Sequence, residues 1–208
     1  MTKEEEILRA AKEEFFNCGY DACSTAVIAK RAGVTHAMVN YYFRSKEKLF
    51  IQILDSQVYD IIHSLKPVMQ AEGNFIRVVC DAALVIFDKI NENKRFPYLI
   101  SDISRTHPDF LLRYKEVFET VCRDSVRMHA LRLEELIAKG EVAECTMPEI
   151  YHTVLTLTMA PFLTIPFMEK VVGFSQKQVD AYLQSRRDEM VRIIEARLLR
   201  TRAGSPCS

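Results

Sequence analysis

The sequence predicts an all-α fold of about nine helices. Apolar residues recur three and four positions apart along nearly the whole chain, which is the spacing of one helix face. No segment shows the sustained alternation of polar and β-branched residues that is typical of a half-buried strand. With 49% hydrophobic residues in a chain of 208, the helices have enough apolar side chains to bury a core.

The first predicted helix begins in the acidic N-terminal segment and ends at Gly19. A glycine at a helix end adopts the left-handed conformation that closes the last turn without steric cost. One face of this helix is apolar and is predicted to face the core: Ile7, Leu8, Ala11, Phe15 and Phe16. The other face carries Glu and Lys and is predicted to face water.

Two short helices separated by a glycine are predicted next. The hydroxyl groups of Ser24 and Thr25 are suited to cap the first of them, and Thr35 is suited to cap the second, over residues 36–42. Ser45 is placed to cap a longer helix that connects the two halves of the chain.

Beyond Pro67 the helical pattern lengthens, with joints at Gly, Pro or Asn. The predicted helices cover residues 74–91, 97–105, 108–138, 147–171 and 176–200. Residues 203–208 are predicted to be a disordered tail. Since no internal repeat is present, this C-terminal region is predicted to be one helical domain.

Composition bounds the class of protein. The 28 basic and 28 acidic residues cancel, so any basic surface must come from local clustering. The acidic start is unlike a signal peptide, and we expect a cytoplasmic protein. The apolar run at residues 156–168 is short for a membrane span and contains Pro161 and Pro166, which favours a buried, kinked helix.

The six cysteines show no Cys-x-x-Cys pair and no zinc-type spacing. A reducing cytosol disfavours disulfides, so we expect buried thiols, with Cys207 as an exception on the tail. No metal and no cofactor is expected.

The segment from Thr25 to Phe43 has the length and the central Gly33 turn of a helix-turn-helix. Ala29 is small where the two helices must approach closely. Apolar residues of this segment are predicted to form a compact core with the first helix: Ile28, Val34 and Val39 against Ile7, Ala11 and Phe15. The residues left outward are small or form hydrogen bonds, which suits contacts with DNA: Thr35, His36, Ala37, Met38, Asn40 and Tyr41.

Local charge agrees with this interpretation. Five basic residues and the single acid Glu47 lie between positions 30 and 48: Lys30, Arg31, Arg44, Lys46 and Lys48. Lys46 begins a helix, where backbone N–H groups also favour a phosphate.

The stretch ILRAAKEEFFNCGYDACSTAVIAKRAGVTHAMVNYYFRSKEKLF, residues 7–50, closely resembles the N-terminal module of the TetR family of bacterial transcription regulators. The resemblance rests on the ILRAA opening, Phe16 with Gly19-Tyr20, the IAKRAGV turn and the YYF-x-SKEKLF close. It implies a DNA-binding domain over residues 1–47 and an effector-binding and dimerisation domain over residues 48–202. By position, seven residues match the family's DNA-facing positions: Thr25, Thr35, His36, Ala37, Asn40, Tyr41 and Lys46.

The resemblance further implies a homodimer through the last two helices, double-stranded DNA and a small-molecule effector as partners, and repression as the default outcome. The sequence departs from the family's usual residues at His36, Ala37 and Asn40, so the operator does not follow from relatives. Asn40 can pair with adenine through two hydrogen bonds or contact a phosphate, and His36 can contact a base or remain a bystander.

An effector pocket is expected where aromatic and polar residues of the middle helices mix: Phe87, Tyr98, Asp102, Arg105, His107, Tyr114, Phe118, His129 and Met159. The last two helices carry more apolar surface than one face needs, which favours a four-helix dimer interface. The sequence motifs of hydrolases, phosphate loops and di-metal sites are missing, so an enzyme is not expected. The alternative from another class is a ligand- or partner-binding module whose helix-turn-helix does not read DNA.

Overall fold

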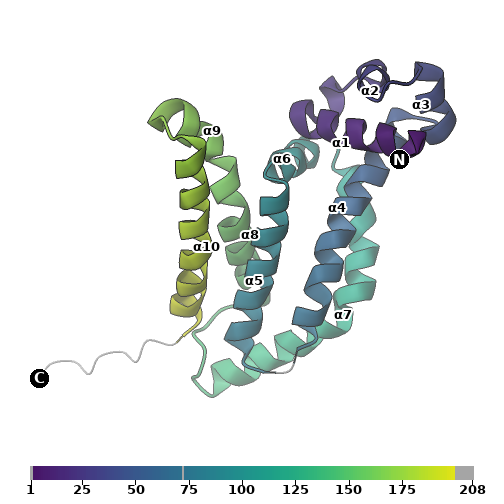
Figure 1. The fold of residues 1–208 in the computed structure, drawn as a ribbon. Coiled ribbons are helices and arrows are strands. Elements are labelled where there is room, and N and C mark those ends of the chain that lie inside the picture. Colours follow the sequence, from purple (N-terminus) through teal and green to yellow (C-terminus); the bar gives the residue numbers. More distant parts are fainter. Residues whose placement is uncertain (1, 72, 200–208) are drawn as a thin grey trace, which may run out of the picture. The chain divides into compact units, whose positions relative to one another are not determined.

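Helices form nearly all of the regular structure in residues 2–71 and 73–199, the part of the chain described by this computed structural model (Figure 1). The side chains of residues 118–122 are not described, and the predicted tail at 203–208 lies outside the described residues. An isolated backbone bridge joins Val142 to Leu199. The predicted all-α fold class is confirmed.

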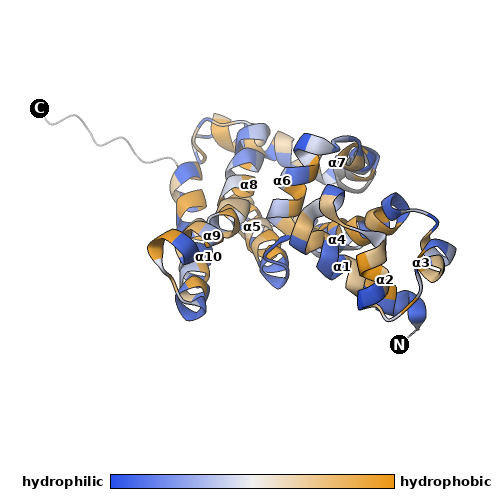
Figure 2. Cartoon of the chain, turned by 90° about the horizontal axis from the view of Figure 1, so that it is seen from above, coloured by the Kyte–Doolittle hydropathy of each residue, from blue (hydrophilic) through white to orange (hydrophobic). Residues whose placement is uncertain are grey.

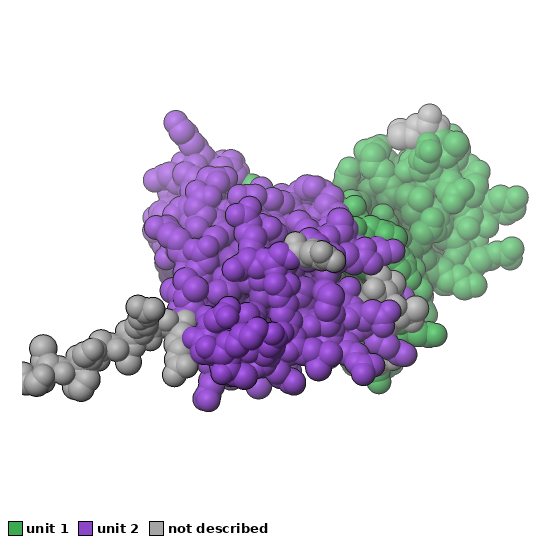
Figure 3. All heavy atoms as spheres, turned by 90° about the horizontal axis from the view of Figure 1, so that it is seen from below, with its two compact units in different colours: residues 1–63, 93–116 green, residues 64–92, 117–208 purple. Residues whose placement is uncertain are grey.

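The chain forms two compact units, each built from segments that are distant in sequence (Figure 3). Unit 1 consists of Met1–His63 and Asn93–Glu116. Unit 2 consists of Ser64–Glu92 and Val117–Ser208. Residues 93–116 therefore belong with the N-terminal module and not with the helices that flank them in sequence.

Unit 1 is organised around the helix α1, Lys3–Ala22, which packs against α2, Thr25–Arg31, and against α6, Phe96–Thr106. The core of the unit is aromatic. The rings of Phe15 and Phe50 meet edge to face at 4.9 Å. Phe16 lies 6.5 Å from Phe96 of α6. The unit also contains α3, His36–Phe43, and the first parts of α4, Lys46–Met69, and of α7, Asp109–Ala138.

The predicted end of the first helix at Gly19 is only partly right. Gly19 has φ 80° and ψ 177°, which interrupts the regular helix, but one more turn follows as far as Ala22. This conformation is not the left-handed helical one, because ψ is extended. It is a region that essentially only glycine adopts, so Gly19 produces a kink and not a stop.

Two of the three predicted caps are present. Thr35 Oγ1 accepts a hydrogen bond from the Met38 N–H at 3.3 Å, and Ser45 Oγ accepts one from the Lys48 N–H at 3.1 Å. Ser24 occupies the cap position of α2, but its hydroxyl makes no capping hydrogen bond. Thr25 is the first residue of α2 and its hydroxyl bonds elsewhere, as described below.

In unit 2, α5, Phe75–Glu92, packs against α8, Met147–Leu163, and α10, Gln176–Leu198. Phe87 of α5 meets Phe162 of α8 with ring centroids 4.9 Å apart. Arg187 donates two hydrogen bonds of 2.7 Å to the carboxylate of Asp88, which ties α10 to α5. Unit 2 thus has a three-helix core, and the second part of α7 also belongs to this unit.

The predicted single helix over 147–171 is wrong in its second half. α8 ends at Leu163, a short α9 covers Ile165–Phe167, and a π-helix, η1, covers Met168–Val172. Pro166 explains the break, because it has no N–H to donate to the carbonyl one turn earlier and its ring clashes with that turn. This division accounts for the helices beyond the nine expected.

The stretch Met147–Val172 is long and apolar enough, by length and composition, to cross a membrane. Only 28% of its most apolar window is buried within the chain. Core helices of soluble proteins have the same composition, so one such stretch is weak evidence for a membrane protein. Within it, Pro161 and Phe162 are buried, but most of the window is not, so the expectation of a buried, kinked helix is only partly met.

Cys23 is buried as expected, but the expectation that all cysteines on ordered segments are buried is wrong for Cys18, which is exposed.

Candidate nucleic-acid interface

The helix α3 has one buried and one exposed side. Val39 and Phe43 are buried. In the preceding helix α2, Ile28 and Ala29 are buried as well. Five of the predicted DNA-facing residues are exposed: Thr35, His36, Ala37, Asn40 and Tyr41. Met38, predicted to face outward, is half-buried. The packing therefore leaves a polar helix face open to a partner.

The first residues of α2 and α3 are joined by a hydrogen bond. Thr25 Oγ1 lies 2.9 Å from His36 Nε2, and both residues belong to the predicted DNA-facing set. No local pattern predicts this pair, because the two residues are eleven positions apart and meet only when the turn is folded.

The end of α3 has an unusual backbone. Arg44 has φ 66° and ψ −44°, and its N–H donates to the Asn40 carbonyl at 2.9 Å. Positive φ values are rare for residues other than glycine and cost about 1–3 kcal/mol. Tyr41, with 77% of its surface exposed, precedes this turn, and its ring meets Tyr42 edge to face at 5.3 Å.

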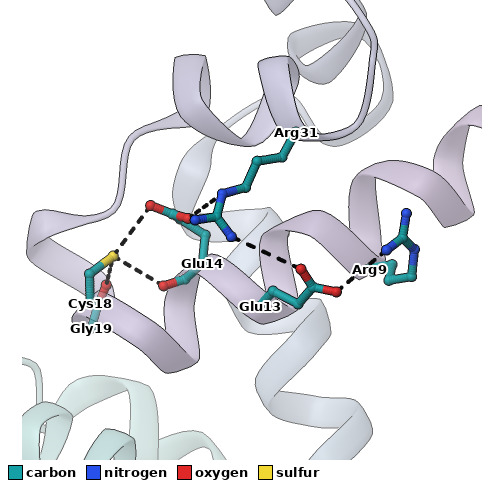
Figure 4. A network of polar contacts seen from close by, with 6 residues as sticks. All are labelled: Arg9, Glu13, Glu14, Cys18, Gly19 and Arg31. Carbon is teal, nitrogen blue, oxygen red and sulfur yellow. Dashed lines mark hydrogen bonds and ion pairs between the residues drawn. The ribbon is translucent and has the colours of Figure 1, made fainter.

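The basic residues predicted to lie around the turn differ in their surroundings: some are exposed, and one forms ion pairs within the protein. Lys30, Arg44 and Lys48 are exposed. Arg31 turns back to α1, where its Nε lies 3.0 Å from Glu14 Oε2 and its Nη1 lies 4.0 Å from Glu13 Oε2 (Figure 4). This ion pair ties the end of α2 to α1, so Arg31 is a structural cation.

Lys46 also has partners within the protein. Its Nζ donates to the Asp21 carbonyl at 3.1 Å and lies 4.6 Å from the centre of the Tyr20 ring. The ammonium has three donors, and one is used here. The contact of Lys46 with a phosphate stays a prediction. The same side chain also connects α4 to the end of α1.

The predicted effector residues are divided between the two units. Unit 1 contains Tyr98, Asp102, Arg105, His107 and Tyr114. Unit 2 contains Phe87, His129 and Met159, and the side chain of Phe118 lies outside the described residues. The described members of this set are therefore not all in one unit, and their role in effector binding stays a prediction.

Several of these residues have structural partners in unit 1. His107 Nε2 lies 2.7 Å from Asp21 Oδ1, and the ring of His107 meets Tyr20 at 4.9 Å. Arg105 Nη2 is 3.5 Å from Asp102 Oδ1. The contacts of His107 hold the corner between α6 and α7 against the end of α1, whereas the Arg105–Asp102 pair lies within α6.

Tyr114 is buried and its hydroxyl donates to Asp55 Oδ1 at 2.6 Å. Arg113 Nη2 lies 3.2 Å from the second oxygen of Asp55. Burial, followed by the hydrogen bond to Asp55, holds the pKa of Tyr114 well above its ordinary value. This cluster joins α4 to α7 within unit 1.

In unit 2, His129 is 1% exposed, and its Nε2 lies 2.9 Å from the Met69 carbonyl. Since a carbonyl only accepts, Nε2 carries the proton.

A small pocket elsewhere in the unit has room for about one water molecule. None of the predicted residues lines it: the lining is Val79, Glu149, Ile150, Thr153, Val154, Ile194, Arg197 and Leu198. Within the described residues, no group of three or more His, Cys, Asp or Glu side chains is arranged to hold a metal.

The pair α2 and α3, with a tight turn between them and an exposed, polar second helix, has the arrangement of the helix-turn-helix class of DNA-binding regulators. Residues 7–53 match the family described as bacterial regulatory proteins, tetR family. The N-terminal module of this chain is therefore that of the TetR family, as its sequence predicted.

Two characterised relatives agree with this assignment. The HTH-type transcriptional activator FasR of Mycolicibacterium smegmatis is 26% identical over 148 residues, 66% of each chain. The HTH-type transcriptional regulator QacR of Staphylococcus aureus is 38% identical over 55 residues, 26% of this chain and 29% of QacR. The matches thus span about two thirds of FasR and under a third of QacR.

Solved structures share the fold over most of the chain. The ketosteroid transcriptional regulator KstR2 of Mycobacterium tuberculosis has a TM-score of 0.70 at 15% identity and covers 96% of both chains. A TetR-like transcriptional regulator from Rhodococcus sp. RHA1 has a TM-score of 0.57 at 16% identity, covering 92% of this chain and 95% of that one.

Proposed function

We propose that this chain is a homodimeric, sequence-specific transcription regulator that binds a palindromic operator with α3 in the major groove. The observation that carries the proposal is the exposed face of α3, where residues able to form hydrogen bonds project from a helix whose opposite side is anchored in a core. Such a face suits contact with base edges, which carry the sequence information.

Within this interface we assign roles by side-chain chemistry. Asn40 is the candidate for reading adenine, and His36 and Ala37 lie at the start of α3, nearest the bases. Thr25, Thr35, Tyr41 and Lys46 are the candidates for phosphate contacts, which set position and supply most of the affinity.

Dimerisation through α8 and α10 is supported by their unburied apolar residues. Leu155 of α8 is 51% exposed and Ile193 of α10 is 37% exposed, although both lie on helices that already pack within unit 2. A second copy would cover them. Figure 2 shows further apolar ribbon at α9, between these two helices. A dimer would place two copies of α3 about 34 Å apart, one turn of the duplex.

We further propose that a small molecule controls operator binding and that the free protein represses transcription in the cytoplasm. FasR carries the description of an activator, so the opposite outcome is a specific alternative. A reporter gene placed behind the selected operator distinguishes the two. Deletion of the regulator raises reporter expression if it represses and lowers it if it activates.

The decisive experiment is selection of binding sites by the purified chain from a random duplex pool at two salt concentrations. The proposal predicts an enriched palindrome whose binding weakens steeply with salt, because bound phosphates release counterions. Mass spectrometry of the protein first excludes a co-purified effector. Absence of binding at low salt by such effector-free protein would contradict the proposal and favour a ligand-binding module.

A further inference from the structure

The ring of Tyr20, near the end of α1, is surrounded by rings from other parts of unit 1. It meets His107, between α6 and α7, edge to face at 4.9 Å, and Phe110 of α7 edge to face at 5.0 Å. Phe50 of α4 lies 4.8 Å away. The rings of His107 and Phe110 also stack on each other at 5.1 Å. These contacts restrict the position of the Tyr20 ring.

Asp21, the next residue, is held from the same corner. Its Oδ1 lies 2.7 Å from His107 Nε2. Because an ionised carboxylate only accepts hydrogen bonds, the imidazole Nε2 is the donor. His107 thus contacts two consecutive residues of α1, one through its ring and one through its proton.

The same two residues of α1 hold Lys46. The Lys46 Nζ lies 4.6 Å from the centre of the Tyr20 ring and donates to the Asp21 carbonyl oxygen at 3.1 Å. The Lys46 side chain is half-buried, whereas Lys30 and Lys48 are exposed. A free lysine side chain samples many rotamers, and this freedom is lost when the ammonium binds a ligand. The contacts with Tyr20 and Asp21 restrict the ammonium in advance, which favours binding.

We propose that His107 is a positioning residue for operator binding: through Tyr20 and Asp21 it holds the Lys46 ammonium where a phosphate of the duplex binds. The inference rests on the proposed function, in which Lys46 contacts a phosphate. Two routes lead from the imidazole to the ammonium. One passes through the Tyr20 ring, and the other passes through the Asp21 side chain and its backbone carbonyl.

Replacing the imidazole with an apolar side chain interrupts both routes. In His107→Leu, the Asp21 carboxylate loses a donor and the Tyr20 ring loses an edge-to-face partner, so Lys46 is held less firmly. Each phosphate contact that is lost lowers the slope of log affinity against log salt by about 0.9. A variant that only destabilises the fold reduces the amount of active protein and leaves this slope unchanged. The salt slope therefore distinguishes positioning from stability.

The test is a salt titration of the selected operator with four full-length proteins: the unaltered chain, Lys46→Ala, His107→Leu and the double variant. Lys46→Ala should weaken binding about tenfold and lower the slope by about 0.9 per protomer. His107→Leu should weaken binding about fivefold and lower the slope in the same direction. In the Lys46→Ala background, adding His107→Leu should change the affinity less than about twofold. Equal weakening in both backgrounds overturns the proposal, because His107 then does not act through Lys46.

Two further variants control for the fold. His107→Gln keeps an N–H that can donate to Asp21, and it should recover most of the affinity and slope lost in His107→Leu. Thr106→Val removes a neighbouring hydrogen bond that stays within α6, and its slope should equal that of the unaltered chain. A lowered slope in Thr106→Val overturns the specific role of His107.

The same titration separates failure of this inference from failure of the proposed function. If the unaltered chain binds the operator but Lys46→Ala keeps the full slope, Lys46 contacts no phosphate, and the inference fails while DNA binding stands. If the unaltered, effector-free chain binds no duplex at low salt, the proposed function fails and the inference fails with it.

Discussion

Thr25 Oγ1 and His36 Nε2 lie 2.9 Å apart and connect the first residue of α2 to the first residue of α3. Both side chains are among those proposed to face DNA. The hydrogen bond restricts both side chains, so each residue orients the other before DNA arrives.

The first prediction is that these two residues act as a unit in operator binding. Thr25→Ala and His36→Ala should each weaken binding, and the double variant should lose less than the sum, by about 0.5–1.5 kcal/mol. Duplex titration of the four proteins measures this coupling. Thr25→Ala combined with Tyr41→Ala is the control and should be additive. Additivity in both cycles would show that the hydrogen bond does not persist on DNA.

A second prediction separates base reading from phosphate contact on α3. Asn40→Ala should relax the preference at one position in each half-site and cost about 1–3 kcal/mol on the selected operator. Tyr41→Ala should instead weaken all duplexes similarly, and its high exposure means that folding should be nearly unaffected. Repeating the selection with each variant checks both. An unchanged operator with Asn40→Ala would remove Asn40 from base readout.

The third prediction concerns the strained backbone at Arg44. Arg44→Gly relieves the positive φ and should raise the free energy of unfolding by about 1 kcal/mol. Arg44→Ala keeps the strain and should leave stability nearly unchanged. If the guanidinium contacts a phosphate, both variants should lower the salt slope of duplex binding by about 0.9. Urea unfolding and salt titration measure the two effects, and equal stabilities of the two variants would contradict the strain.

Local signals explain why the helix-turn-helix was predictable. Gly33, with φ 64°, forms the turn, and Thr35 caps the helix that follows it, so both affect only the structure a few residues away. The buried Ile28 and Val39 follow the helical period. The Thr25–His36 hydrogen bond and the positive φ of Arg44 depend on how the helices pack together. The residue types in the sequence therefore did not predict them.

The expected effector residues show the limit of such local signals, and their role stays a prediction. His107 is a polar aromatic residue of a middle helix, and it packs beside Tyr20 and Asp21 of the N-terminal module. Residues 93–116 join unit 1 through contacts that are distant in sequence. Helix periodicity identifies which face is buried but not which helix covers it.

The kink at Gly19 yields the fourth prediction. A Cβ at Gly19 would lie 2.9 Å from Asp102 Oδ2, and its φ of 80° with ψ of 177° is nearly restricted to glycine. Gly19→Ala should therefore destabilise the fold by about 2–3 kcal/mol. Gly173→Ala is the matched control, because its left-handed φ of 82° meets nothing within 4 Å, and it should cost about 1 kcal/mol.

Adding Asp102→Ala to Gly19→Ala tells the two causes apart. It removes the close approach but leaves the backbone strain, so it should recover only a minor part of the lost stability. Thermal and urea unfolding measure all four proteins. Full recovery would mean that the contact with Asp102, and not the backbone, makes glycine necessary.

The fifth prediction tests the dimer surface on α8. Leu155 is 51% exposed on a helix that is otherwise part of the unit 2 core. If a second copy covers it, Leu155→Glu places a charge in an apolar interface and should raise the dimer dissociation constant at least about 100-fold. Leu131→Glu on α7 alters a leucine that is 59% exposed, and it should leave the dimer intact. Sedimentation of both variants measures the association. If Leu131→Glu were monomeric and Leu155→Glu remained dimeric, the interface would lie on α7 and not on α8, because a charge disrupts the dimer only at a leucine that the interface covers.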